Sequence, residues 1–175
     1  CSALTGTMTT TDVTCSGGAD GEAGPKPTGG QAPYSYLWND PLATTDKNIF
    51  GLSAGTYLVI ATDANGCMLT LTATINEPAQ LTNTMNQTNV TTSGGDDGTA
   101  TSNPFGGTPT YSYSWSNAET TQIIDTLIAG TYILTLTDVN SCSITDSVTI
   151  LQPPCQNLMI GTSVTNVSCK GGSDG

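Results

Sequence analysis

The chain has 175 residues, among them three lysines and 14 acidic residues, and its net charge is -11 at pH 7. Such a charge excludes a surface that binds nucleic-acid phosphates, and no apolar run in the sequence is long enough to insert into a membrane. Arginine and histidine are both absent, which removes the bidentate anion clamp, the usual general base and the imidazole metal ligand. We therefore expect no enzyme.

A unit of 77 residues repeats along the chain. Leu4, Leu81 and Leu158 are spaced by 77 residues, and the Gly-Gly pairs and Asp-Gly pairs that follow them keep the same register. A fixed long period is the signature of an array. The predicted segments are the end of a preceding joint at 1–3, one unit at 4–80, a second unit with a Pro- and Cys-bearing joint at 81–157, and the start of a third unit at 158–175.

Within a unit, short alternating runs separated by glycine turns predict β-strands. A first strand ends near Val13, and a Gly-Gly-x-Asp-Gly turn leads to a second strand through Ala23. The next strand places aromatic residues at alternate positions, so that they share one face. We interpret this face as core rather than as a sugar-binding platform, since aromatic rings dominate small cores. The aromatic positions are Tyr34, Tyr36 and Trp38, with Tyr111, Tyr113 and Trp115 in the second unit.

The segment from Gly55 to Cys67 returns at Gly130 to Cys142. In each copy a β-branched and aromatic run is followed by an Asp-x-Asn turn, a Cys and a second alternating run, which predicts a β-hairpin. Six or seven such strands per unit predict an all-β fold of tandem immunoglobulin-like antiparallel β-sandwich repeats of about 77 residues.

The cysteines repeat with twice the unit period. Cys1 and Cys155 are 154 residues apart, as are Cys15 and Cys169, whereas Thr92 stands where the second unit would repeat Cys15. From this spacing we predict disulfides between Cys15 and Cys67 and between Cys142 and Cys155. Cys1 and Cys169 would then pair outside this sequence. Zinc and a catalytic thiol are disfavoured, since no C-x-x-C motif and no histidine exist.

Calcium is the one ion for which the turns offer candidate ligands. Aspartates occupy the Gly-flanked turns and begin the Asp-x-Asn turns, at Asp20, Asp97, Asp63 and Asp138. We favour the interpretation that they form turn hydrogen bonds, because Ca²⁺ needs several converging oxygens and no D-x-D run is present. No cofactor is expected.

The motifs V-x-C-x-G-G-x-D-G, G-G-x-x-P-Y-S-Y-x-W, G-L-x-A-G-T-Y and T-D-A-N-G-C together resemble the SprB repeat. This family occurs in very large surface proteins of gliding and related Bacteroidetes. The resemblance implies an extracellular, outer-membrane-attached adhesin filament on the cell surface, exported by type IX secretion and, in gliders, used in motility. It also implies O-glycosylation at Asp-Ser/Thr-apolar sequences, which here gives Thr126 and Ser147 as candidate sites.

Two functions fit this picture. In the first, the repeats are disulfide-stapled spacers in surface adhesion and gliding motility, in contact with neighbouring repeats and with like chains in a fibre. In the second, the repeats themselves bind glycans or an external surface, as a lectin-like module. A catalytic role is disfavoured, because the adjacent carboxylates Asp96 and Asp97 are not shared by the other units, where Ala19 and Ser173 stand in place of Asp96.

Overall fold

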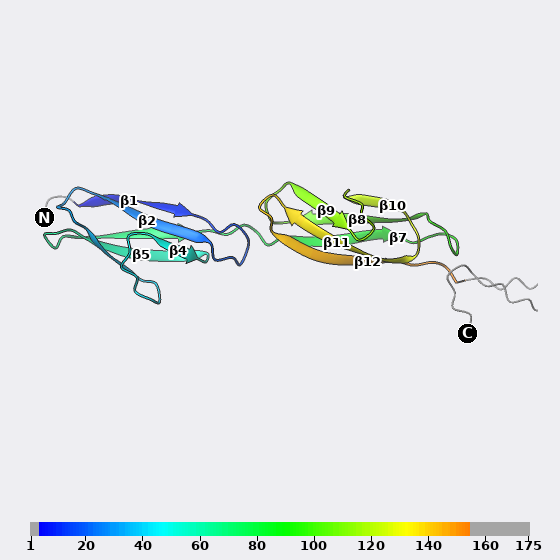
Figure 1. Ribbon diagram of the computed structural model, residues 1–175, viewed down its shortest axis with the longest axis horizontal. Helices are drawn as coiled ribbons and strands as arrows, with labels where there is room; N and C mark the ends of the chain where they lie inside the picture. Colours follow the sequence, from blue (N-terminus) through cyan, green and yellow to red (C-terminus); the bar gives the residue numbers. More distant parts are fainter. Residues whose placement is uncertain (1–3, 155–175) are drawn as a thin grey trace, which may run out of the picture. The chain divides into compact units, whose positions relative to one another are not determined.

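A computed structural model describes residues 4–154, all of whose regular structure is β-strand. The chain divides into two compact units, Cys1–Gln80 (unit 1) and Leu81–Gly175 (unit 2), shown in Figure 1. The described residues contain no helix that could cross a membrane. The expected all-β fold of immunoglobulin-like sandwiches is confirmed, and each unit is described below by itself.

Unit 1 consists of two three-stranded antiparallel sheets, with strand orders β1-β2-β4 and β3-β5-β6. Its strands are β1 Thr5–Thr11, β2 Gly21–Thr28, β3 Ser35–Trp38, β4 Ile49–Leu52, β5 Gly55–Thr62 and β6 Met68–Ile75. The longest ladder is the predicted hairpin, in which β5 and β6 pair from Gly55 with Ile75 to Thr62 with Met68. Because side chains alternate across a strand, each sheet turns one row inward and the other to solvent.

The inward rows of unit 1 form one core. Val59, Ala61 and Ala73 are almost completely buried, and Trp38 is 2% exposed. The indole Nε1 of Trp38 donates to the carbonyl of Asp46 at 3.0 Å, which satisfies its single polar atom. The aromatic face of β3 is therefore core, as predicted, with Tyr34 and Tyr36 half-buried beside the tryptophan.

Unit 2 repeats this architecture, with sheet orders β10-β8-β7 and β12-β11-β9. Its strands are β7 Thr82–Thr88, β8 Gly98–Phe105, β9 Tyr111–Trp115, β10 Ile123–Leu127, β11 Gly130–Asp138 and β12 Ser143–Ile150. Leu134 and Leu136 are fully buried, and Trp115 is 3% exposed. Its Nε1 donates to the carbonyl of Thr121 at 2.9 Å, the same bond as in unit 1.

Each unit has two ends, which we call the entry end and the exit end. At the entry end of unit 1, the chain arrives at Leu4 beside the β5–β6 turn, which includes Asp63. At the exit end, the loop after β1 meets the residues that follow β6, because Val13 N–H donates to the carbonyl of Asn76 at 2.9 Å. In unit 2 the corresponding bond joins Val90 N–H to the carbonyl of Leu151 at 3.1 Å.

Candidate functional site: the two ends of each repeat

The entry end of unit 1 is organised around the carboxylate of Asp63. Its Oδ1 accepts the backbone N–H groups of Asn65 and Cys67 at 2.9 and 2.8 Å, and its Oδ2 accepts that of Gln31 at 2.9 Å. Asp63 is only 5% exposed. The N–H donors of Gln31 and Cys67 hold the pKa of this carboxyl below its ordinary value. The Asp-x-Asn-Gly-Cys motif is thus a hub that ties the hairpin turn to the loop after β2.

A glycine at the entry end makes this hub possible. Gly30 has φ +63°, and a Cβ on it would lie 2.7 Å from Oδ2 of Asp63. Only glycine can adopt this left-handed backbone conformation and also lie so close to the Asp63 carboxylate, because it has no Cβ. Unit 2 repeats the arrangement with Asp138, which accepts N–H groups from Thr108, Asn140 and Cys142 at 2.8 to 2.9 Å.

The exit end carries a second aspartate in each unit. Asp20 accepts the N–H of Thr14 at 3.0 Å and also the Thr14 hydroxyl. Asp97 likewise accepts the N–H and hydroxyl of Thr91, at 2.9 and 2.6 Å. The threonine hydroxyl, followed by the threonine N–H, lowers the pKa of each of these two carboxyls.

The candidate calcium ligands are therefore turn-forming residues that the fold keeps apart. Asp20 lies at the exit end and Asp63 at the entry end, and the same separation holds for Asp97 and Asp138. Their oxygens accept backbone and hydroxyl hydrogens, as turn aspartates do. Within residues 4–154, no three acidic, histidine or cysteine side chains gather as metal ligands would.

The residues that follow the last strand are fastened to the exit end. In unit 1, the carboxylate of Glu77 accepts the N–H of Gly17, and Asp12 accepts the N–H of Asn76 at 2.8 Å. In unit 2, Gln152 Oε1 accepts the N–H of Gly94 at 3.2 Å. The sequence analysis did not predict these contacts. Glu77 and Gln152 do stand at equivalent positions, each directly before a proline, and this match could have indicated a shared role.

Cys15, Cys67 and Cys142 are each disulfide-bonded, as expected for structural cysteines, but the geometry of unit 1 does not fit the predicted pairing of Cys15 with Cys67. Cys15 lies in the exit-end loop, where its carbonyl accepts the N–H of Gly18, whereas Cys67 lies at the entry end on the Asp63 hub. The eight residues of β6 separate these ends by about 26 Å. The Cα atoms of a disulfide are about 4.4–6.8 Å apart, so Cys15 and Cys67 are not bonded to each other.

The predicted bridge from Cys142 to Cys155 meets the same obstacle. Cys1, Cys155 and Cys169 lie outside the described residues. Cys142 is at the entry end of unit 2, whereas Leu151 is at the exit end, beyond the eight residues of β12. Four residues from Leu151 to Cys155 extend at most about 14 Å, which is roughly half the length of β12. Because Cys155 is not among the described residues, this pairing stays a prediction, which the length of β12 disfavours.

Thr126 and Ser147, the candidate glycosylation sites, are both exposed. Thr126 has φ +57° at the irregular end of β10, and its hydroxyl lies 3.0 Å from Oδ1 of Asp125. Ser147 lies on β12, opposite Ile133 of β11. Both hydroxyls are accessible to a modifying enzyme, and glycosylation itself stays a prediction.

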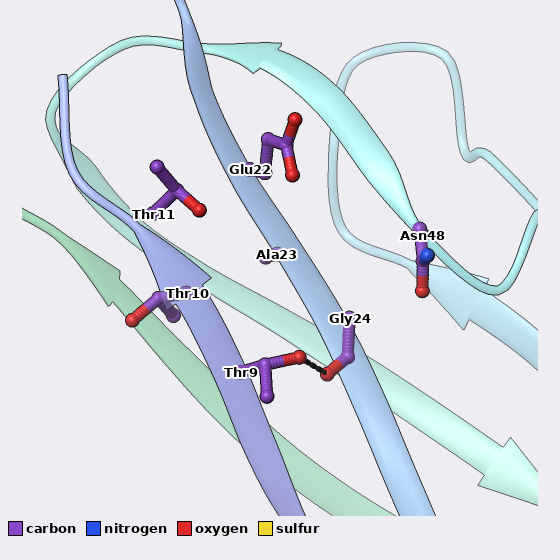
Figure 2. A pocket seen from close by; sticks show the side chains of 7 residues that line it. All are labelled: Thr9, Thr10, Thr11, Glu22, Ala23, Gly24 and Asn48. Atoms are coloured by element: carbon purple, nitrogen blue, oxygen red, sulfur yellow. Dashed lines mark hydrogen bonds between the residues drawn. The ribbon is translucent and has the colours of Figure 1, made fainter. Parts of the chain in front are cut away.

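A small polar pocket crosses the outer face of the β1-β2-β4 sheet in unit 1 (Figure 2). Its volume is about 90 Å³, and the Thr9 hydroxyl at its wall donates to the carbonyl of Gly24 at 2.9 Å. The lining residues are Thr9, Thr10, Thr11, Glu22, Ala23, Gly24 and Asn48. Ligand pockets usually measure about 300–1,000 Å³, so this hollow is too small to enclose a sugar ring. In unit 2 the place of Asn48 is taken by Ile123.

Both units are thus immunoglobulin-like β-sandwich modules arranged in tandem along one chain. The family model described as "SprB repeat" matches residues 7–43 and 84–120, the first half of each unit. The SprB repeat model thus matches this chain twice, once in each unit. Comparison with curated protein sequences found no match.

Alignments with solved structures cover most of this chain, and the first of them, with a TM-score above 0.5, shows a related fold. The three N-terminal domains of the highly immunogenic outer capsid protein (Hoc) of bacteriophage RB49 align with a TM-score of 0.54 at 17% identity, covering 86% of this chain and 59% of that one. An amphioxus IgVJ-C2 molecule aligns at 14% identity with a TM-score of 0.36, covering 85% and 98%. Fibronectin(III)-like modules of Clostridium thermocellum CbhA align at 14% identity with a TM-score of 0.30, covering 83% and 94%.

Proposed function

We propose that this chain is a structural repeat segment of a long extracellular adhesin, in which each unit acts as a spacer. The observation that carries the proposal is the path of the chain through each sandwich. It enters unit 1 at Leu4 and leaves at Glu77 at the opposite end, and it enters unit 2 at Leu81 and leaves at Gln152. Within each unit the entry and the exit of the chain are therefore separated by roughly the length of a strand, about 26 Å, as a spacer requires.

The exit-end contacts support the same role. The bonds from Gly17 to Glu77 and from Gly94 to Gln152 hold the first residues of each joint against the unit that they leave. Pro78 and Pro153 then restrict the next step of the chain. A joint with one fixed side and a proline is short and stiff, which suits a spacer better than a flexible tether.

The bonded cysteines support a place outside the cytoplasm. Disulfides persist mainly in oxidising compartments, and Cys15, Cys67 and Cys142 are all disulfide-bonded. Together with the SprB repeats, this favours a cell-surface protein. Export by type IX secretion and a part in gliding motility extend the proposal to what the resemblance implies.

Direct glycan binding is the weaker alternative. Unit 1 offers a polar hollow of about 90 Å³, lined by hydroxyls, a carboxylate and an amide, and a mostly apolar hollow of about 260 Å³. The apolar hollow is lined by Leu37, Trp38, Asn39, Leu58, Ile60 and Thr70. No aromatic ring lines the polar hollow, and Trp38, which borders the apolar hollow, is only 2% exposed, as Trp115 is only 3% exposed. The sugar-stacking surface that such a module commonly presents is therefore not supplied by either tryptophan.

Small-angle scattering on this chain and on a tandem duplication of its two units tests the spacer. The expected result is a maximum dimension that grows in proportion to the number of units. A compact four-unit particle would contradict the proposal. A glycan array probed with the same two proteins is the control, because saturable binding that Asn48→Ile abolishes would favour the lectin-like role instead.

A further inference from the structure

Unit 1 carries an apolar surface that the spacer role does not use. Its centre is the apolar hollow of about 260 Å³ on the outer face of the β3-β5-β6 sheet. The side chains of Leu37, Leu58 and Ile60 border it, and each of them is at least 37% exposed. A cavity of about 150 Å³ already holds a benzene molecule, so this hollow has room for an aliphatic side chain.

The sheet face around the hollow is uncharged. On β5 the outward-facing residues are Thr56, Leu58, Ile60 and Thr62, and the described strands β3 and β6 add only serine, threonine, leucine and methionine. The other sheet of unit 1, in contrast, exposes a glutamate and a lysine on β2. With a net charge of -11, two copies of the chain repel each other, and this repulsion is weakest where two neutral surfaces meet.

A leucine projects from the loop at the edge of the hollow. This loop joins β3 to β4, begins at Asn39 on the border of the hollow and projects from the sandwich in Figure 1. Leu42 within it is 86% exposed. The carboxylate of Asp40 accepts both the N–H and the hydroxyl of Thr44 at 2.7 Å, which fixes the shape of the loop. The Leu42 side chain is therefore held in solvent, off the hollow of its own unit.

Unit 2 lacks both the hollow and the projecting leucine. Ser114 and Thr135 stand at the positions of Leu37 and Ile60. The loop that follows the tryptophan is two residues shorter in unit 2, and residues 116–119 include no leucine. The leucine and the hollow thus occur together in one unit and are absent together from the other, as expected for the two halves of one contact.

We propose that this surface joins two copies of the chain, with Leu42 of each copy inserted into the apolar hollow of the other. Because both halves lie on the same unit, the contact is isologous and forms twice per dimer. A three-stranded sheet with strands of about 26 Å presents a face of roughly 350 Å², less than the about 800 Å² per partner in a stable interface. One contact is therefore weak, and several in parallel bind more tightly. The proposal goes beyond the spacer role and does not depend on it.

Sedimentation equilibrium of the intact chain tests the contact. Between about 10 μM and 1 mM protein, the chain should pass from monomer towards dimer, as a weak interface predicts. The dimer fraction should rise from about 0.02 to 0.5 M NaCl, because salt screens the repulsion between two acidic copies. A chain that stays monomeric throughout would overturn this proposal and leave the spacer untouched. Association that salt weakens would also overturn it, because charged contacts would then hold the copies together.

Two variants each remove one half of the contact. Leu42→Ser removes the projecting side chain, whereas Leu37→Ser combined with Ile60→Thr gives the hollow the residues of unit 2. Each variant should raise the dissociation constant by about tenfold or more, because the apolar contact is lost twice per dimer. Phe50→Ser is the matched control, since Phe50 is 64% exposed on the other sheet of unit 1. It should leave the dissociation constant unchanged.

A mixture of the two variants distinguishes the proposed insertion from other ways of associating. The Leu42→Ser chain keeps its hollow, and the double variant keeps Leu42, so a heterodimer forms one intact contact whereas each homodimer forms none. The mixture should therefore contain more dimer than either variant alone. Equal dimer fractions in all three samples, or a loss of dimer in Phe50→Ser, would refute the insertion of Leu42 into the hollow.

Discussion

Unit 2 holds a polar network inside its sandwich at positions where unit 1 has apolar groups. Asn83 donates to Asp146 at 3.0 Å and accepts from the hydroxyl of Ser102, which is fully buried, at 2.7 Å. The matched positions, unit 1 first, are Gly6 and Asn83, Pro25 and Ser102, and Leu71 and Asp146. Both units keep the aspartate hydrogen bonds at their two ends and the buried tryptophan. These three core positions, in contrast, all differ between the units.

The difference shows which contacts the fold requires. A buried polar side chain is tolerated only with a partner, so Asp146 and Asn83 must change together. Pro25 has no N–H, whereas the N–H of Ser102 donates to the carbonyl of Gln122 at 3.0 Å. The sandwich therefore accepts either the apolar set of residues or the polar set, provided that all three positions of a unit belong to the same set.

The largest expected loss of stability follows from removing the buried tryptophan, and it should be the same in both units. Trp38→Ala and Trp115→Ala should each destabilise their own unit by about 3–5 kcal/mol, because a large buried ring is removed. Fluorescence of the remaining tryptophan during urea unfolding reports the other unit, which should keep its midpoint. Leu37→Ser is the control, since Leu37 is 48% exposed and unit 2 has Ser114 there. Equal unfolding of both units in either variant would contradict independent cores.

The next effect should separate the two units. Asp146→Ala leaves the Asn83 amide without its acceptor and should cost unit 2 about 1–3 kcal/mol, measured by urea unfolding followed at Trp115. The combined variant Asn83→Gly, Ser102→Pro and Asp146→Leu installs the unit 1 residues and should recover most of that loss. If the triple variant is less stable than Asp146→Ala, the two networks are not interchangeable.

Acid should destabilise unit 1 more than unit 2. Hydrogen bonds lower the folded-state pKa of Asp20, Asp40 and Asp63 in unit 1 and of Asp97 in unit 2. A lowered folded pKa contributes stability that is complete above the unfolded value of about 3.9 and is lost as pH falls through the folded value. Thermal melts between pH 6 and 2 should show a decline that begins near pH 4. Asp63→Asn should flatten the decline in unit 1, and an unchanged profile would contradict this assignment.

The smallest expected effect concerns one backbone position. Thr126 has φ +57° where unit 1 has Gly51 at φ +69°. A β-branched residue is strained in this left-handed region, so Thr126→Gly should stabilise unit 2 by about 0.5 kcal/mol and Gly51→Thr should destabilise unit 1 by about 1 kcal/mol. Calorimetric melting temperatures of the two variants check both signs. Opposite signs would mean that side-chain contacts outweigh the strain.

Much of the fold follows from local pattern. The alternation in the hairpins and in the Tyr-x-Tyr-x-Trp segments predicted strands and a buried tryptophan, because side-chain direction is fixed by the two-residue period. Cysteine spacing does not predict disulfide partners, because it gives loop lengths, whereas the partners depend on which end of the sandwich each loop occupies. The Asp63 hub joins groups 32 residues apart, a contact that no local pattern encodes.

Some missed contacts did leave a trace in the sequence. When the two units are aligned, Asp146 is equivalent to Leu71 and Asn83 is equivalent to Gly6. A change of two positions together from apolar to polar indicates that their side chains are in contact. The central strand β2 was harder to predict, because it contains Pro25 and a proline normally argues against a central strand. The structure accommodates it because β4 pairs with β2 only through Gly21, Glu22 and Ala23.

The opposed entry and exit of the chain determines how a unit responds to tension. A pull on Leu4 and Glu77 acts along β1 and β6, parallel to the strands and across their hydrogen bonds. The seven residue pairs of β1 with β2 and the eight of β6 with β5 are then loaded together in shear, whereas a unit with both termini at one end would open pair by pair. Rupture under shear needs many bonds to fail at once. A pull along the length of a repeat should therefore unfold it only at a higher force than it would need if both termini lay at one end.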